Sequence, residues 1–306
     1  MENRNRAQFT PEASQVLLAE ACKIAGLGSA NAELIRLGEN AIYRLSVAPL
    51  VVRIARSGQM LDDVRKEMRV ARWLALEEYP AVRLVSDLHE ADIPLMVSSH
   101  PVTFWHFVSS AQPLPGPSDL GGLLRRLHEL PVPDWLALPA FQPFARVEQR
   151  LNCAPPEVTP GDVDFLRERF RQLKEALRRL QFHFPFGPVH GDAHPANLLR
   201  SANGEVVLLD FEAFSWGPRE WDLSLTAGYR YGFEWLDERD YAKFVSAYGY
   251  DVSQWEGFRV LSAIRELGMT TWLMQLAGHD AARRDEFRVR IDDLRSGRYP
   301  RRWRPF

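Results

Sequence analysis

A short stretch near the middle of the chain, "PVHGDAHPANLL" (residues 188–199), gathers four chemically capable side chains: His190, Asp192, His194 and Asn197. One interpretation is a tightly held metal ion, because residues 190, 192 and 194 would share one face of an extended strand. A second is phosphoryl transfer, with a carboxylate as base and an amide as magnesium ligand. The third is an ordinary polar turn.

The metal interpretation predicts a zinc or binuclear hydrolase that uses His190, Asp192 and His194. Its remaining ligands would be further His or Cys residues at defined spacings. The two cysteines and the other histidines of the chain form no such pattern. A metal-dependent hydrolase is therefore only the second alternative.

Phosphoryl transfer makes further demands, and the sequence meets most of them. Asn197 follows Asp192 by five residues, the spacing of a catalytic base and a magnesium ligand in kinases. A second carboxylate, Asp210, ends the apolar run "VVLLD". The dipeptide at residues 203–204, Asn-Gly, predicts a tight hairpin that would return Asp210 toward Asn197. This combination is far more specific than the Asp–Asn spacing alone.

The elements that must position these residues form two groups. Two β-rich runs, "AIYRLSV" and "LVVRIA", lie between helices predicted over residues 10–26 and 62–78. With "ELIRL" before them and "AVRLVSDL" and "IPLMVSS" after them, they predict a five-stranded sheet crossed by one helix. Helical patterns dominate later, including a buried seam over 162–180. We therefore expect an α+β fold with an N-terminal lobe over residues 1–100 and a larger helical lobe over 101–306.

Composition excludes several classes of protein. The formal net charge of −2 provides no global field for nucleic acid or an anionic membrane surface. Two distant cysteines indicate a reducing compartment, and no signal peptide or membrane-spanning apolar run is present. We expect a soluble cytoplasmic protein without nucleic-acid or membrane partners. The basic tail "RSGRYPRRWRPF" is predicted to be a solvated terminal segment.

These motifs resemble those of the aminoglycoside phosphotransferase and choline kinase-like small-molecule kinases, distant relatives of protein kinases. The resemblance covers roughly residues 30–280 and is most specific in "HGDAHPANLL" followed by "LLDFEAFSWGPREWDLS". It implies a two-lobed protein-kinase-like fold with a small antiparallel-sheet lobe and a mainly helical lobe. It also implies that Asp192 is the catalytic base and that Asn197 and Asp210 are magnesium ligands.

The same resemblance implies supporting residues around that centre. Asp222, within "WDL", would brace the catalytic loop, and His190 would shape that loop rather than carry a proton. His194 stands where many family members also have His. Glu212 follows Asp210 by two residues and would share its strand face, so it could assist metal binding or lie as a solvated carboxylate.

The N-terminal lobe of this family clamps the nucleotide with a strand cation paired to a helix carboxylate. Glu67 lies on or beside the buried stripe of the helix over 62–78, where an ionised carboxylate requires a partner. Most relatives would have Lys in the strand, whereas "LVVRIAR" offers Arg53. Arg can bind phosphate bidentately, with a different reach. Two hypotheses follow: a functioning variant clamp, or a nucleotide-binding protein with weak or no turnover.

Further predictions concern the nucleotide itself. "LGEN", which contains Gly38 and Asn40, resembles the turn that covers the phosphates, although a single glycine is a weak signal. The linker after "PLMV", from Ser98 to His100, would recognise adenine through main-chain hydrogen bonds. ATP is the expected phosphate donor, with GTP not excluded, and Mg²⁺ is the expected metal.

The acceptor is predicted to be a small molecule that carries a hydroxyl: an aminoglycoside-like antibiotic, an aminoalcohol, a sugar or an amino acid. An antibiotic acceptor would imply a role in resistance. A polycationic acceptor would suit the acidic residues Glu220, Glu234, Asp237, Glu238 and Asp240. Nearby aromatic residues could stack on the acceptor. The alternative is a solvated acidic face with the aromatic residues in the core. We expect a monomer or a homodimer.

Overall fold

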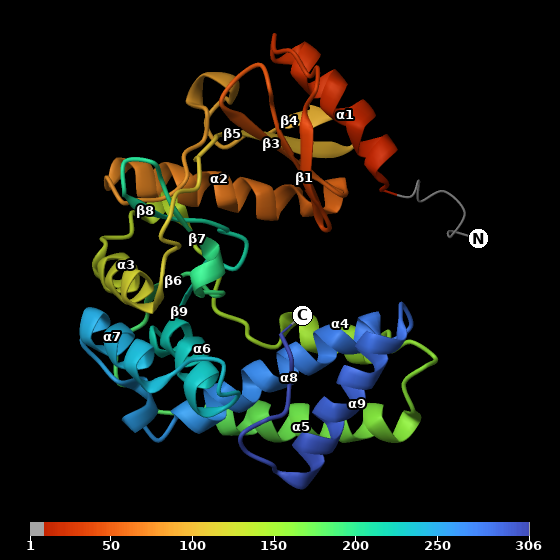
Figure 1. Cartoon of the computed structure of the whole chain (residues 1–306), viewed down its shortest axis with the longest axis vertical. Coiled ribbons are helices and arrows are strands. Elements are labelled where there is room, and N and C mark those ends of the chain that lie inside the picture. Colours follow the sequence, from red (N-terminus) through yellow and green to blue (C-terminus); the bar gives the residue numbers. More distant parts are fainter. Residues whose placement is uncertain (1–8, 306) are drawn as a thin grey trace. The chain divides into compact units, whose positions relative to one another are not determined.

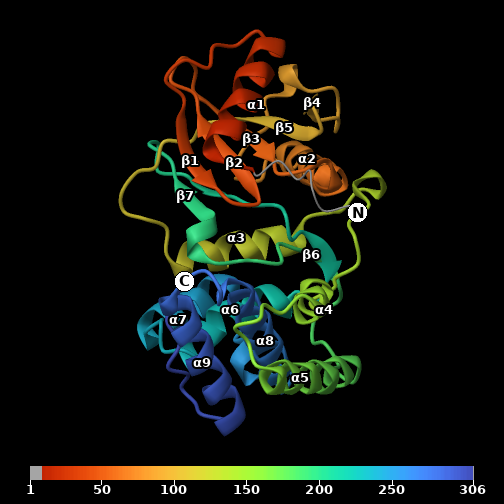
Figure 2. The same ribbon diagram turned by 90° about the vertical axis from the view of Figure 1, so that its right-hand side faces the viewer.

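The computed structural model describes residues 9–305, and its contacts divide the chain into two compact units (Figures 1 and 2). Unit 1 runs to Pro115 and also contains Pro131–Leu138 and Ala196–Phe214; the remaining residues form unit 2. This division differs from the predicted boundary at residue 100. It places the second half of the catalytic motif in the same unit as the sheet.

Unit 1 is built on a five-stranded antiparallel sheet of order β1-β2-β3-β5-β4 (Figure 1). Its strands are β1 (Glu33–Leu37), β2 (Asn40–Arg44), β3 (Leu50–Ala55), β4 (Leu95–Val97) and β5 (His100–His106). The unit also contains the helices α1 (Pro11–Ile24) and α2 (Leu61–Leu76) and the strands β7 (Leu198–Arg200) and β8 (Val206–Leu208). The antiparallel sheet and its helices match the predicted fold class.

The two helices pack on opposite faces of the sheet because side chains alternate along each strand. Val52 and Ile54 of β3 belong to the apolar cluster that contains Leu18 of α1. Ala55, one residue further along, packs with Met68 of α2. Arg53 has the same strand phase as Ala55, so its side chain points toward α2.

One predicted strand is wrong. Residues 81–88, "AVRLVSDL", form no strand and make only isolated bridges, Ala81 with Leu208 and Leu84 with Trp105. The fifth strand is instead β5, which pairs with β3 and β4. The segment 98–99 is consequently a hairpin turn between β4 and β5, and the chain leaves the sheet only after His106.

The predicted Asn-Gly hairpin is confirmed. β7 and β8 pair antiparallel, and Gly204 at the turn has a φ of +88°, which glycine adopts without steric cost. The backbone N–H of Leu209 then donates to the carbonyl oxygen of Asn197 at 2.9 Å. The next residue, Asp210, has a φ of +60°, an unusual conformation for a residue with a side chain.

Unit 2 is mainly helical. Its helices are α3 (Pro117–Glu129), α4 (Ala145–Asn152), α5 (Pro160–Arg178), α6 (Glu220–Tyr231), α7 (Glu238–Tyr248), α8 (Phe258–Leu276) and α9 (Ala281–Ser296). Two short strands, β6 (Gly187–Val189) and β9 (Ser215–Gly217), pair antiparallel. Leu166 and Leu173 of the predicted seam in α5 share a core cluster with Leu261 of α8. No helix in the described part of the chain is long and apolar enough to cross a membrane.

The prediction of a solvated basic tail holds for most of residues 295–305, which are exposed, but it is wrong for Arg301 and Trp303, which are buried. Arg301 is buried and pairs with Glu266 of α8 at 2.7 Å, while Arg302 pairs with Asp293 of α9 at 2.6 Å. The Trp303 ring is also buried, with the Arg290 guanidinium 4.8 Å from its centre. Arg301 and Arg302 each form an ion pair with a buried carboxylate from an earlier helix. The local sequence of the tail does not reveal these distant partners.

Candidate active site

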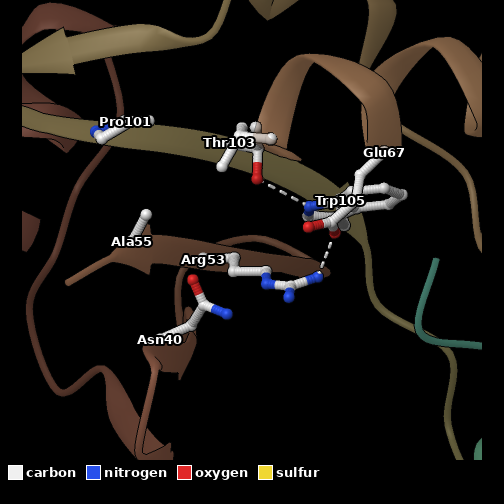
Figure 3. A pocket seen from close by; sticks show the side chains of 8 residues that line it. Asn40, Arg53, Ala55, Glu67, Pro101, Thr103 and Trp105 are labelled. Atoms are coloured by element: carbon white, nitrogen blue, oxygen red, sulfur yellow. Dashed lines mark hydrogen bonds and ion pairs between the residues drawn. The ribbon is translucent and has the colours of Figure 1, made fainter. Parts of the chain in front are cut away.

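The cation and carboxylate predicted for the nucleotide clamp meet in unit 1. Arg53 projects from β3 and donates through Nη1 to Oε2 of Glu67 on α2 at 2.5 Å (Figure 3). Only 5% of the Glu67 side chain is exposed, so the ion pair compensates a nearly complete loss of hydration. Asn40 from β2 and Thr103 from β5 line the same pocket, because these positions share one face of the sheet.

Glu212 provides a second carboxylate for the same guanidinium. Nη2 of Arg53 donates to Oε1 of Glu212, and Nδ2 of Asn40 donates to the same oxygen at 2.8 Å. Lys66, the neighbour of Glu67 on α2, donates through Nζ to the main-chain carbonyl of Glu212. Glu212 is therefore not the solvated carboxylate that was one of its two predicted roles. Both ends of the Arg53 guanidinium are occupied by carboxylates.

The pKa values of this cluster follow from burial and from two cations, Arg53 and Lys66, that lie among three carboxylates. Burial raises the pKa of Glu67 to about 7; Glu212 and Asp210 add to this rise, and Arg53 opposes it. For Arg53, burial favours deprotonation, but Glu67, Glu212 and Asp210 together outweigh it and raise the pKa. Arg53 thus stays charged, while Glu67, the most deeply buried acid, resists ionisation.

Asn197 and Asp210, the predicted magnesium ligands, also belong to unit 1. The hydrogen bond from Leu209 to the Asn197 carbonyl joins the two segments immediately before Asp210. Oδ1 of Asp210 accepts the backbone N–H of Glu212 at 3.3 Å. An amide oxygen and a carboxylate suit Mg²⁺, which binds few protein oxygens and completes its shell with water and phosphate. The donor set therefore fits this metal.

In unit 2, the loop that carries Asp192 is fixed by the fully buried Asp222 of α6. Oδ2 of Asp222 accepts the backbone N–H of His190 at 2.7 Å, and Oδ1 accepts that of Gly191 at 2.8 Å. Nε2 of His128 on α3 lies 3.0 Å from Oδ2. Nδ1 of His190 accepts the backbone N–H of Asp192 at 3.3 Å. This arrangement is the brace expected of Asp222 and His190.

Asp192 is held as an ionised carboxylate. Burial opposes its ionisation, but the imidazole of His194, 3.6 Å away, together with Arg265 and His190 lowers its pKa to about 2. About 55% of its side chain is exposed, so the carboxylate is reachable from solvent. A base must be both ionised and accessible, and Asp192 meets both conditions.

Asp192 belongs to unit 2, whereas Asn197 and Asp210 belong to unit 1. The convergence of these three side chains stays a prediction.

Sequence reasoning missed several residues that hold these groups. Trp221 donates through Nε1 to the carbonyl of Gly191 at 2.8 Å. Arg265 of α8 lies 3.9 Å from the centre of the Trp221 ring and donates to its carbonyl at 2.6 Å. Trp221 stands within the "EWDLS" motif and could have been found there. His128 and Arg265 come from distant helices with no local signal, whereas Lys66 is adjacent to Glu67.

The remaining nucleotide predictions fare differently. Ser98 and His100 lie in the β4–β5 hairpin rather than in the linker that leaves the sheet, which corrects the reason for assigning them to adenine. Nδ1 of His100 instead lies 2.9 Å from the Ala55 carbonyl. Gly38 lies in the turn between β1 and β2, and Asn40 is the first residue of β2; the Gly38 N–H donates to the Asn40 carbonyl at 3.0 Å.

The acidic residues considered for a polycationic acceptor are mostly engaged within unit 2. Oε1 of the buried Glu220 accepts the backbone N–H groups of residues 183 and 184. Asp237 caps α7 through the N–H of Asp240, whose carboxylate pairs with Lys243. Of the aromatic residues, Phe233 and Trp235 stack on each other with ring centres 4.6 Å apart. These contacts favour the structural interpretation for the engaged acids and for Phe233 and Trp235, whereas Trp216 and Tyr231 are exposed.

The hydrolase alternative receives no geometric support. The described residues, 9–305, contain no group of three His, Cys, Asp or Glu side chains arranged to hold a metal ion. His190 is completely buried, and its Nδ1 accepts the Asp192 N–H. His190, Asp192 and His194 therefore act as parts of a loop rather than as a set of metal ligands.

Comparison with known proteins identifies a family of phosphotransferases and solved structures of kinases with a similar fold. The sequence model of a family described as "Phosphotransferase enzyme family" matches residues 33–261. A choline/ethanolamine kinase family protein from Mesorhizobium loti is 20% identical with a TM-score of 0.61, covering 94% of this chain and 92% of the other.

Two further solved structures have the same fold. The amicoumacin kinase hAmiN, solved with AMP-PNP, Ca²⁺ and Ami, is 14% identical with a TM-score of 0.70 and covers 96% and 98% of the two chains. The choline kinase LicA of Streptococcus pneumoniae is 15% identical with a TM-score of 0.64, covering 92% and 99%. Among curated proteins, none matches the sequence.

Proposed function

Because the chain belongs to the phosphotransferase enzyme family and is a phosphotransferase, we propose that it transfers the terminal phosphate of ATP to a hydroxyl of a small molecule, with Mg²⁺ as cofactor. Asp192 orients the acceptor hydroxyl and accepts its proton. Asn197 and Asp210 hold the metal, which neutralises charge on the phosphates when bound. Asp222 keeps the Asp192 loop in place.

The observation that carries this proposal is the support of the catalytic loop. Two consecutive backbone N–H groups, those of His190 and Gly191, donate to the carboxylate of Asp222. Trp221 binds the carbonyl of Gly191 from the same helix. The loop is thus fixed before any substrate binds, and a base held in advance at one position lowers the barrier through orientation.

The test is ADP release across a panel of hydroxylated compounds. Asp192→Asn keeps the size of the side chain but removes the base, so turnover with the best acceptor should fall by about 10²–10⁴-fold. ADP affinity should remain close to wild type. Asp164→Asn on α5, a largely exposed position, is the matched control and should leave turnover unchanged. Comparable turnover in Asp192→Asn would refute the assignment of the base.

The structure provides one reason to retain the rival function, a nucleotide-binding protein with weak or no turnover. Both terminal nitrogens of Arg53 are engaged by Glu67 and Glu212 rather than free for phosphate. Magnesium-dependent nucleotide binding without ADP release for any acceptor would favour that rival.

The acceptor panel should span four chemical classes: antibiotics, aminoalcohols, sugars and amino acids. The internal engagement of Glu220, Asp237 and Asp240 weakens the argument for a polycation. Neutral and zwitterionic acceptors should therefore be represented equally in the panel.

GTP should be compared with ATP as phosphate donor. A cytoplasmic location and a monomeric or homodimeric state remain predictions.

A further inference from the structure

The sharing of Arg53 between two carboxylates is the starting point. Glu67 approaches from α2, and Glu212 approaches from the segment that follows β8. Asn40 and Lys66 add hydrogen bonds that hold Glu212 in place, one to its carboxylate and one to its main-chain carbonyl. The guanidinium thus has a carboxylate at each end.

The net charge of this cluster opposes nucleotide binding. Arg53 and Lys66 contribute two positive charges, whereas Glu67, Glu212 and Asp210 contribute three negative charges when all are ionised. A phosphate chain brings further negative charge, and it must compete with Glu212 for Nη2 of Arg53. Like charges placed close together in a partly buried site repel one another strongly.

A divalent cation changes this balance because of where Glu212 stands in the chain. The backbone N–H of Glu212 donates to Oδ1 of Asp210, so the two carboxylate-bearing residues are joined locally. A metal held by Asp210 would attract the Glu212 carboxylate directly or through a bound water. Such a move would break the Arg53–Glu212 ion pair and leave Nη2 able to donate to a phosphate.

We propose that Glu212 is a positioning residue that occupies Arg53 in the metal-free protein and releases it when magnesium and nucleotide bind. This inference rests on the proposed function, since it assumes a magnesium-bound nucleotide as substrate. It also accounts for arginine at position 53. Arg has two separate donor ends, so it can keep Glu67 at one end while it exchanges Glu212 for phosphate at the other. A lysine ammonium has no such second end.

The experiment is isothermal titration of the full chain with ADP, once with EDTA and once with Mg²⁺. Wild type should bind ADP weakly in EDTA and more tightly with Mg²⁺. Glu212→Gln removes the ionised competitor for Arg53, so its ADP affinity in EDTA should rise by about tenfold, the equivalent of about 1.4 kcal/mol. The gain in affinity from Mg²⁺ should shrink correspondingly.

Two controls separate this effect from a general change of charge. Glu205→Gln removes the same charge from an exposed position in the β7–β8 hairpin and should leave ADP affinity unchanged. Glu212→Asp keeps the charge on a shorter side chain that reaches Arg53 poorly, so it should also gain ADP affinity in EDTA. If Glu212→Asp binds ADP in EDTA as wild type does, then the affinity gain of Glu212→Gln comes from the lost charge alone. That result would overturn the proposal.

The remaining outcomes are also decisive. An ADP affinity of Glu212→Gln in EDTA that is equal to or below that of wild type overturns the proposal. If circular dichroism shows that neither Glu212 variant folds, the carboxylate is a structural requirement and the proposal also fails. Wild-type protein that binds neither ADP nor GDP with Mg²⁺ instead refutes the proposed function, which is a distinguishable result.

Discussion

The two units hold their buried carboxylates in different ways. In unit 2, Asp222 is bound by two backbone N–H groups and by His128. In unit 1, Glu67 and Glu212 are bound mainly by the ends of a long side chain, that of Arg53. Backbone donors cannot leave without unfolding their loop, whereas a guanidinium can change partners by rotating a few bonds. We therefore expect the carboxylate cluster of unit 2 to keep its partners, whereas that of unit 1 can exchange them.

The pKa directions of the two clusters follow the same division. At Asp222, burial opposes ionisation, but the combined effect of His128, His190 and the backbone donors is larger and lowers the pKa. At Glu67, burial wins, and the pKa rises to about 7. The largest favourable contribution at Asp222 comes from the His128 side chain, and the backbone donor adds to it, whereas at Glu67 the nearby acids Glu212 and Asp210 add to the effect of burial.

The largest expected effect on stability comes from removing Asp222, the carboxylate that His190, Gly191 and His128 share. Asp222→Ala leaves the N–H groups of His190 and Gly191 and the His128 ring without their buried partner. The free energy of unfolding should fall by roughly 3–5 kcal/mol, the usual cost of removing one partner of a buried charged network. Urea denaturation measures it. Asp222→Asn keeps one acceptor oxygen and should lose less; a loss below about 1 kcal/mol in Asp222→Ala would contradict the comparison.

A smaller effect concerns the pH dependence of unit 1. Because the folded pKa of Glu67 is raised to about 7, its stabilising contribution is complete below the ordinary carboxyl pKa and is lost as the pH rises through 7. The free energy of unfolding of wild type should therefore fall by about 1–3 kcal/mol between about pH 5 and pH 8, relative to Glu67→Gln. Urea titrations at both pH values measure this difference. Parallel behaviour of the two proteins would show that Glu67 does not titrate in this range.

The smallest effect concerns Asp192, the accessible carboxylate of unit 2. Its pKa of about 2 means that the carboxyl carbon should show no titration by ¹³C NMR between neutral pH and about pH 4. His194→Gln removes the imidazole that lies 3.6 Å from Asp192 and should move the midpoint up toward the ordinary Asp value of about 3.9. The carboxylate of the variant remains ionised at pH 7, so turnover there should not fall through protonation. A wild-type midpoint above about pH 5 would exclude Asp192 as a permanently ionised base.

Local patterns in the sequence predicted much of the fold. Thr10 caps α1 by accepting the N–H of Ala13 at 3.2 Å, and the Asn-Gly hairpin forms where predicted. The error over residues 81–88 has a physical cause. Ala81 and Leu84 make only isolated bridges, to Leu208 and Trp105, and residues 86–88 turn into a 3-10 helix, so the apolar run does not continue as a strand. The true strand, β5, contains the strand formers Val102, Thr103 and Phe104, but it begins with His-Pro at the predicted lobe boundary.

The candidate site was predictable where motifs are contiguous. The spacing of Asp192, Asn197 and Asp210 and the pairing of Arg53 with Glu67 could be proposed from the chain alone. The role of Glu212 could not, because its partners at positions 40, 53 and 66 are more than 140 residues away in sequence. Distant pairings of this kind depend on the fold, and no local pattern encodes them.

The ion pairs of Arg301 and Arg302 have a consequence for the stability of α8 and α9. Glu266 and Asp293 lie on α8 and α9, but Arg301 and Arg302, which neutralise them, follow both helices in the chain. A variant that lacks both arginines would therefore keep two completely buried carboxylates, Glu266 and Asp293, without these ion-pair partners.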